Sequence, residues 1–446
     1  MSSRYLELAP SNKTTDDKYA FKKGVAQINW TIPEGNYVLD PTSVRIVGDI
    51  RYYKDEAGTA PIAGEALTSS ARLGVWACFQ QLIWRSSKHQ TTLSHERNWN
   101  RWLSSYISLT SSTTDDALSH FSESALTLPN YEAHKRSVVA GNAIHSFCCH
   151  LPCSMLNSGA SIPLTGNTLG GLDLSIMLES DAMALQVLPA NFSTDPAVAG
   201  FEGAYYEMSN IKLVCSVITP PPDQLSRLLS QKEGSMTIQA IHSYYDTANS
   251  QNLQLSMNFA LNKVKSLYVN FIPSNKLNNL ANDSFATLDP MNTDGIIADI
   301  LKISVLRGGT LFPKLFPRDC NIKEEIDTMM PDPILIKDYI NSVVAFDKAT
   351  HIQGSLANAN RNYVGKVVGG TNTGIPYQLV NNGGVVAGVG VNFDNFLGGS
   401  GVDMNSVPFG LAIESNLTTN NSQSLFVYVN AETTILFNQS GIQVLQ

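Results

Sequence analysis

A proline run, Pro220–Pro222, lies near the middle of this 446-residue chain. Consecutive prolines fix the backbone and donate no hydrogen bonds, so a β-sheet does not continue through them. The run separates residues 1–218 from residues 223–446, two nearly equal lengths that both have the pattern of β-strands. This arrangement predicts one β-sandwich repeated within a single polypeptide, an organisation that suits assembly and binding better than catalysis.

Apolar side chains recur at every second position in short runs bounded by glycine, proline and asparagine. In a β-strand this spacing places them on one face, as in a half-buried antiparallel sheet. Such runs occur in both halves, at residues 28–32, 44–50, 172–178 and 211–217, and again at 253–259, 267–271, 411–413 and 425–429. Residues 433–445 are predicted to form a final strand pair. The sequence therefore predicts an all-β protein built from sandwiches or barrels.

Helical patterns are few and short. We expect one helix to open at Pro222 and to end at Gly234, where it would brace one sandwich against the other. A second helix is predicted to begin with Ser94 as its N-cap and to carry an aromatic stripe as far as Tyr106. A third is expected over Asn321–Met330, before Pro331.

The composition is poor in charge. Only 15% of the residues are charged, against roughly 25% in an average soluble domain. Asn, Ser and Thr replace them, and these can pack at polar interfaces without the cost of burying ions. Residues 104–146 and 354–406 are rich in small polar residues and lack periodicity, which predicts long surface loops. Dense assembly of identical subunits fits this composition, and so does a loop-rich β protein.

The chain is acidic, with a net charge of −8, and its nearest approach to a basic patch lies in residues 1–23. We interpret this segment as a mobile N-terminal arm, in preference to a tail that contacts a genome. No specific nucleic-acid binding is predicted. No stretch approaches 18 uncharged apolar residues, and the first ten residues lack an apolar signal core, so we expect neither a membrane span nor a secretory signal.

Three of the six cysteines, Cys148, Cys149 and Cys153, lie between or beside His145 and His150. Zinc sites usually bring together ligand pairs from separate segments, whereas these residues fall within one predicted strand. Adjacent strand residues point to opposite faces, so Cys148 and Cys149 cannot both face one metal. The sequence therefore favours buried free thiols over a metal site.

No active-site motif is recognisable along the chain. The glycine-rich nucleotide loops, the nucleophile elbow and the HExxH zinc motif are absent. A Ser–His–Asp triad assembles only in the fold, and nothing here points to one. The cluster of Trp76, Trp84, Trp99 and Trp102 is interpreted as core, with a sugar- or partner-stacking surface as the alternative. We predict no catalytic, cofactor-binding or metal-binding residues and no cofactor.

Three sets of segments together resemble one known family. The first is Gly74–Trp84, leading to Glu96 and Tyr106; the second is Ile162–Leu164, Gly170–Glu179 and Tyr206–Val214; the third runs from Tyr363–Gly365 through Gly399–Gly401 and Asn405–Pro408 to Leu411–Glu414. They resemble segments of double jelly-roll major capsid proteins from tailless icosahedral DNA viruses. The first is similar to the family's strand, surface turn and aromatic-ended helix, the second to the closing strands of the first jelly roll, and the third to the equivalent closure of the second. The nearest type is that of polinton-like viruses, adintoviruses and virophages.

The resemblance implies two tandem eight-stranded antiparallel jelly rolls with a few short helices and long loops. With the proline run, it divides the chain into an arm at 1–23, a first jelly roll at 24–219, a hinge and short helix at 220–234, and a second jelly roll at 235–446. It also implies a non-enzymatic subunit of the virion, whose pseudo-hexameric homotrimers tile an icosahedral shell.

The implied partners are its own copies, neighbouring capsomers and minor capsid or penton proteins, with an underlying membrane left open. The alternative function is a glycan- or receptor-binding β-sandwich, such as a lectin, fibre or spike. A third class, an enzyme on a β-scaffold, would need a pair of carboxylates flanking a sugar, and no such pair is recognisable.

Overall fold

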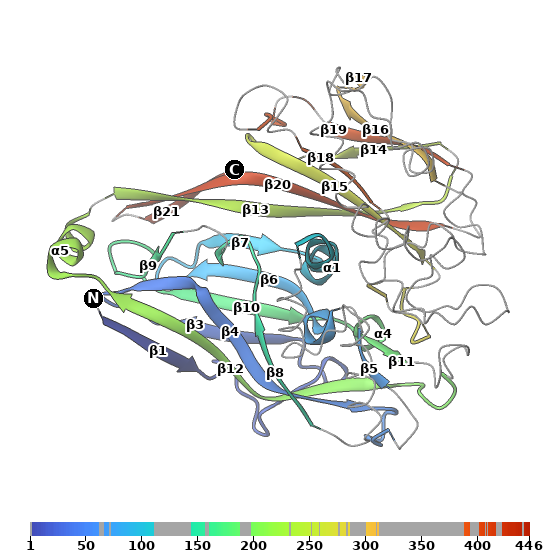
Figure 1. The fold of residues 1–446 in the computed structure, drawn as a ribbon, viewed down its shortest axis with the longest axis horizontal. Coiled ribbons are helices and arrows are strands. Elements are labelled where there is room, and N and C mark those ends of the chain that lie inside the picture. Colours follow the sequence, from blue (N-terminus) through green and yellow to red (C-terminus); the bar gives the residue numbers. More distant parts are fainter. Residues whose placement is uncertain are drawn as a thin grey trace.

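The computed structural model contains two adjacent β-sandwiches, one from each half of the chain (Figure 1). The structure describes residues 2–61, 67–70, 73–110, 144–156, 160–187, 198–231, 233–250, 252–257, 259–274, 277–281, 284–285, 300–308, 310–311, 388–392, 401–405, 407, 409–415, 422–438 and 441–446.

The first sandwich comes from the N-terminal half. Its strands are β1 (Ser2–Leu8), β2 (Lys18–Tyr19), β3 (Gln27–Ile32), β4 (Val38–Tyr53), β6 (Phe79–Ser86), β7 (Thr92–Glu96), β8 (His145–His150), β9 (Ile162–Pro163), β10 (Leu172–Leu178) and β12 (Tyr205–Thr219). One sheet has the order β1-β12-β4-β8, with β2 on β12 and β9 on β4, and the facing sheet has the order β3-β10-β6-β7. A separate small sheet pairs β5 (Leu67–Ser69) with β11 (Leu185–Val187).

The second sandwich comes from the C-terminal half. Its strands are β13 (Glu233–Ala248), β14 (Asn252–Met257), β15 (Val264–Pro273), β16 (Ile300–Arg307), β17 (Thr310–Leu311), β18 (Gly388–Asn392), β19 (Phe409–Ser415), β20 (Gln423–Asn438) and β21 (Gly441–Leu445). One sheet has the order β13-β20-β15-β18, with β21 on β20, and the other has the order β14-β19-β16-β17. The predicted final strand pair over residues 433–445 is confirmed as the end of β20 and β21.

Both sandwiches have the same connectivity. When the eight principal strands of each are numbered along the chain, one sheet reads 1-8-3-6 and the other reads 2-7-4-5, in both halves. The pairings within these sheets are antiparallel. Two sheets that exchange strands in this way form a jelly roll. The chain is therefore a double jelly roll, as the sequence predicts.

The alternating runs form the strands and supply the core. In β10, Leu172, Leu174 and Ile176 are buried, and Leu174 lies between Trp30 of β3 and Trp84 of β6. In β20, by contrast, five consecutive residues from Leu425 to Val429 are buried, so both faces of this strand are covered. The alternating pattern predicts only one buried face.

The N-terminal segment is part of the first jelly roll, so the prediction of a mobile arm is wrong. Strand β1 pairs with β12 along its whole length, from Ser2 opposite Thr219 to Leu8 opposite Leu213. Beyond β1, the Ser11 backbone N–H donates to the carbonyl of Asn29 at 2.7 Å and covers the outer edge of β3. Counted from its strands, this jelly roll begins at residue 2 and not at residue 24.

The helices are short, as expected, but their bounds differ from the prediction. In the described residues they are α1 (Trp99–Thr110), α4 (Asp181–Ala184) and α5 (Pro222–Ser230), with 3-10 turns η1 (Phe21–Lys23) and η2 (Gly74–Cys78). Ser94 lies within β7 and does not cap α1, because Asn98, at a φ of 50°, turns the chain between strand and helix.

Helix α5 ends before β13, which takes in the predicted end of the helix at Gly234. No residue of α5 is buried, so it does not brace the sandwiches through a packed face. The predicted helix over Asn321–Met330 lies outside the described residues, as do most of the predicted loops at 104–146 and 354–406.

Candidate functional site at the junction of the two jelly rolls

The cysteine cluster lies on β8 and in the residues after it. Cys149 is buried and Cys148 is exposed, so the adjacent pair points to opposite faces, as predicted. Cys78, Cys153 and Cys215 are also free and buried, and burial raises the pKa of the Cys215 thiol to about 11. Within the described ranges, no group of three or more His, Cys, Asp or Glu residues is arranged to hold a metal ion.

The tryptophan cluster belongs to the core, which confirms the preferred interpretation. Trp76, Trp84 and Trp99 are buried, and Trp102 is partly buried against the second jelly roll. The Trp99 indole N–H donates to the carbonyl of Pro152 at 2.9 Å. Among the helices that the structure describes, none is long and apolar enough to cross a membrane.

The basic residues near the N-terminus are engaged within the chain. Lys18 and Lys23 form ion pairs with the buried carboxylate of Glu207 at 2.9 and 3.1 Å, and Lys23 also lies 5.2 Å from the ring centre of Tyr205. Burial opposes ionisation of Glu207, but the two lysines outweigh it and lower the pKa of this carboxyl. The other basic residues of this segment also have partners within the chain. Arg4 lies over the ring of Tyr37, Lys13 forms an ion pair with Asp17, and Lys22 forms one with Glu56.

Helix α1 of the first jelly roll anchors the second through Arg101. This buried side chain lies over the rings of Phe285 and Phe426, 4.9 and 4.4 Å from their centres. Its Nη1 donates to the carbonyl of Ser284 at 2.6 Å. A planar guanidinium can stack on aromatic faces while its N–H groups donate in the ring plane, which a lysine cannot do. Arg101 therefore fixes the two jelly rolls to each other.

A second contact joins β7 to β13, which lie close together in Figure 1. The Ile241 N–H of β13 donates to Ser154 Oγ at 3.1 Å, and the Ser154 N–H donates to Glu96 Oε1 at 2.7 Å. Glu96 is fully buried, and burial raises the pKa of its carboxyl to about 7. The apolar core is also shared, since Ile238 and Phe437 belong to the same buried cluster as the first jelly roll.

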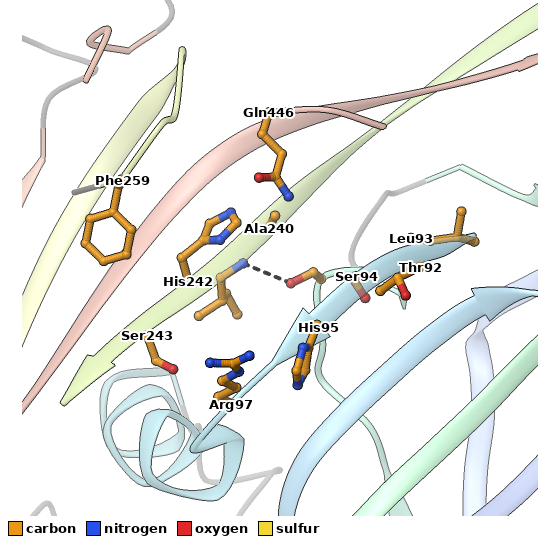
Figure 2. A pocket seen from close by; sticks show the side chains of 12 residues that line it. Thr92, Leu93, Ser94, His95, Arg97, Ala240, His242, Ser243, Phe259 and Gln446 are labelled. Atoms are coloured by element: carbon orange, nitrogen blue, oxygen red, sulfur yellow. Dashed lines mark hydrogen bonds between the residues drawn. The ribbon is translucent and has the colours of Figure 1, made fainter. Parts of the chain in front are cut away.

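A cleft of about 250 Å³ opens beside this contact, between β7 and β13 (Figure 2). We call it the junction cleft, and its polar lining residues are Thr92, Ser94, His95, Arg97, Ser154, His242, Ser243 and Gln446. Burial lowers the pKa of His242, and burial with nearby Arg97 and Arg85 lowers that of His95. Both imidazoles are therefore mostly neutral at pH 7.

Sequence reasoning missed these junction residues. Arg101 lies within an aromatic helix stripe, where a buried cation is rare unless it is paired. The place of Arg101 in this stripe was the one available indication that it is buried. The sequence does not indicate which distant residues contact it. Glu96 was noted only as part of the family resemblance, without a structural role.

The fold defines a class of protein before any comparison: two jelly rolls of identical connectivity in one chain, joined by a packed interface. No protein-family model and no curated protein matches the sequence. Solved structures match it in fold alone, at about a tenth sequence identity.

The particular matches include three capsid structures. The Faustovirus major capsid protein aligns with a TM-score of 0.59 at 8% identity, over 98% of this chain and 90% of its own. The PBCV-1 virus capsid aligns with a TM-score of 0.57 at 10% identity, over 100% and 96%. The mavirus major capsid protein aligns with a TM-score of 0.52 at 9% identity, over 99% and 89%.

Proposed function

We propose that this chain is a major capsid protein whose pseudo-hexameric homotrimers tile an icosahedral virus shell. The observation that carries the proposal is the repeated 1-8-3-6 and 2-7-4-5 connectivity, which supplies two similar barrels per chain. Three such chains, closed by cyclic symmetry, would give a six-barrelled outline that can pack on a hexagonal lattice. The full-length fold similarity to three capsid structures supports the same function.

The junction supports this function because a tile needs barrels of fixed relative position. Arg101 is buried between two rings of the second jelly roll, and the hydrophobic core runs across both barrels. A shared core of this kind resists hinge motion between domains. A lectin or spike, the alternative function, has no comparable need for two fused barrels of the same connectivity.

The proposed partners follow from the same function. They are further copies of the chain, neighbouring capsomers and minor capsid or penton proteins, and the proposed location is the virion. No specific nucleic-acid binding is proposed, because the chain is acidic and Lys18 and Lys23 are held by Glu207. The role is structural and not enzymatic.

The test is the assembly state of the purified full-length chain. Size-exclusion chromatography with light scattering should give about three times the subunit mass of 48.5 kDa, and negative-stain microscopy should show particles of hexagonal outline. A glycan array run in parallel tests the alternative. A uniform monomer across the accessible concentration range, above all one that binds glycans, would overturn the capsid proposal.

A further inference from the structure

Two residues that line the junction cleft, one from each jelly roll, each carry a buried polar atom without a protein partner. Ser94 is only 7% exposed and its Oγ makes no hydrogen bond, and Nε2 of His242 is likewise buried and unbonded. Leaving a buried polar atom unpaired is unfavourable, and such atoms in a native fold call for an explanation.

The lining chemistry selects the kind of ligand. Arg97 is exposed at the mouth of the cleft and brings a permanent positive charge. The hydroxyls of Ser94, Ser154 and Ser243 line the cleft with the imidazoles, and all of these groups can donate hydrogen bonds. None of the described lining residues is Asp or Glu, and Arg97 is the one permanently charged side chain among them, so the charged side chain of the lining favours an anion.

The cleft also has the location and size of a small-ligand site. Figure 2 shows the labelled side chains coming from both jelly rolls, with Arg97 on the β7 side and His242 and Ser243 on β13. Binding sites occur preferentially at such domain interfaces. A volume of about 250 Å³ admits a phosphate or carboxylate group with some water.

We propose that the junction cleft binds a small oxoanion, a phosphate or carboxylate group, held by Arg97 and by the hydroxyls of Ser94 and Ser243. Because the groups come from both jelly rolls, the bound anion cross-links them. It therefore stabilises the assembled pair in addition to Arg101 of α1. This site does not depend on the capsid function, since either outcome of the assembly test leaves the cleft in place.

The test titrates the full chain with inorganic phosphate and with acetate, at ionic strength held constant with chloride. Calorimetry gives the affinity, and the melting temperature should rise with anion concentration, because a ligand that binds only the folded state stabilises it. Saturable binding of either anion supports the site, and the anion that binds tells phosphate from carboxylate. The absence of saturable binding for both anions overturns the proposal.

Variants locate the binding. Arg97→Gln removes a charge-assisted hydrogen bond and should weaken the affinity by at least about tenfold. Arg227→Gln is the matched control, because Arg227 is exposed on α5 and does not line the cleft. Ser94→Ala, a small change in a buried position, should weaken binding even if Arg97→Gln folds poorly. Equal binding by wild type, Arg97→Gln and Ser94→Ala would show that the anion binds elsewhere.

Discussion

Glu96 is buried beside the junction, with Oε1 bonded to the Ser154 N–H and Oε2 without a protein partner. Its pKa of about 7, against 4.5 for an ordinary glutamate, means that the folded chain holds this proton more tightly than the unfolded chain. The contribution of Glu96 to the free energy of unfolding is therefore largest below pH 4.5 and declines as the pH rises through about 7, by at most about 3 kcal/mol. Glu96→Gln removes this decline, so the variant should gain stability relative to wild type between pH 5 and 8.

Chemical denaturation at a series of pH values measures this difference. Glu432→Gln is the matched control, because the pKa of Glu432 is lowered by its hydrogen bond to Lys263 and by Lys265. A lowered pKa gives stability that is lost only as the pH falls below about 4.5, so this control should show a flat difference from pH 5 to 8. If Glu96→Gln and wild type gave parallel curves over this range, Glu96 would not titrate at the junction.

Residues of this kind mark the limit of what could be predicted from the sequence. Leu172 and Leu174 were assigned to the core from local alternation, because that pattern indicates which face a strand buries. Glu96 is followed by Arg97 and reads as a solvated charge. Its hydrogen-bond partner Ser154 lies 58 positions along the chain, and Ile241, which bonds to Ser154, lies a further 87 positions on. Such contacts leave no local pattern.

Strand β1 closes one edge of the first jelly roll, and we predict that removing it destabilises the chain. Deletion of residues 2–8 breaks seven antiparallel pairs with β12 and leaves that strand as an open edge. Cross-strand pairs are worth roughly 0.2–1 kcal/mol each, so the loss should reach a few kcal/mol. An open edge also promotes association between chains. Thermal melting and light scattering should show a lower transition and more aggregation.

Tyr5→Ser is the control for this deletion. Tyr5 lies in β1 but is 78% exposed, so its substitution should change the stability by no more than about 0.5 kcal/mol. If the deletion variant had the same melting temperature as the full-length chain, residues 2–8 would be a peripheral arm that does not stabilise the jelly roll.

The strands that were predicted correctly have a clear pattern in their own residues. The strands that were missed depend on partners far away in the sequence. Residues 28–32 and 172–178 alternate strictly and form β3 and β10, two strands that pair with each other in one sheet. Strand β1 has only half-buried Leu6 and Leu8, and its partner β12 is some 200 positions away, so the segment looked like a charged tail. Ser94 of strand β7 was predicted to begin a helix, because this short strand ends just before the aromatic stripe of α1.

The two-barrel organisation was predictable at the scale of the whole molecule, because Pro220–Pro222 and the repeated strand pattern are both visible in the sequence. The interface between the barrels was not. Arg101 meets Ser284 and Phe426, residues more than 180 positions away, and only the folded chain brings them together. The sequence thus predicted two modules without predicting how they are joined.

That interface, and not the covalent hinge, should hold the two jelly rolls together. Helix α5 has no buried residue, whereas Ile238, Ile435 and Phe437 of the second jelly roll share the core of the first. If residues 222–230 are replaced by a protease-cleavable linker, the cut chain should elute at the same size as the uncut chain. In the cut chain, Arg101→Ala should weaken the association of the halves, because it removes two ring contacts and leaves the Ser284 carbonyl unpaired, at a cost of about 2–4 kcal/mol. Separation of the cut halves at micromolar concentration without any substitution would instead mean that the hinge, and not the shared core, keeps the barrels paired.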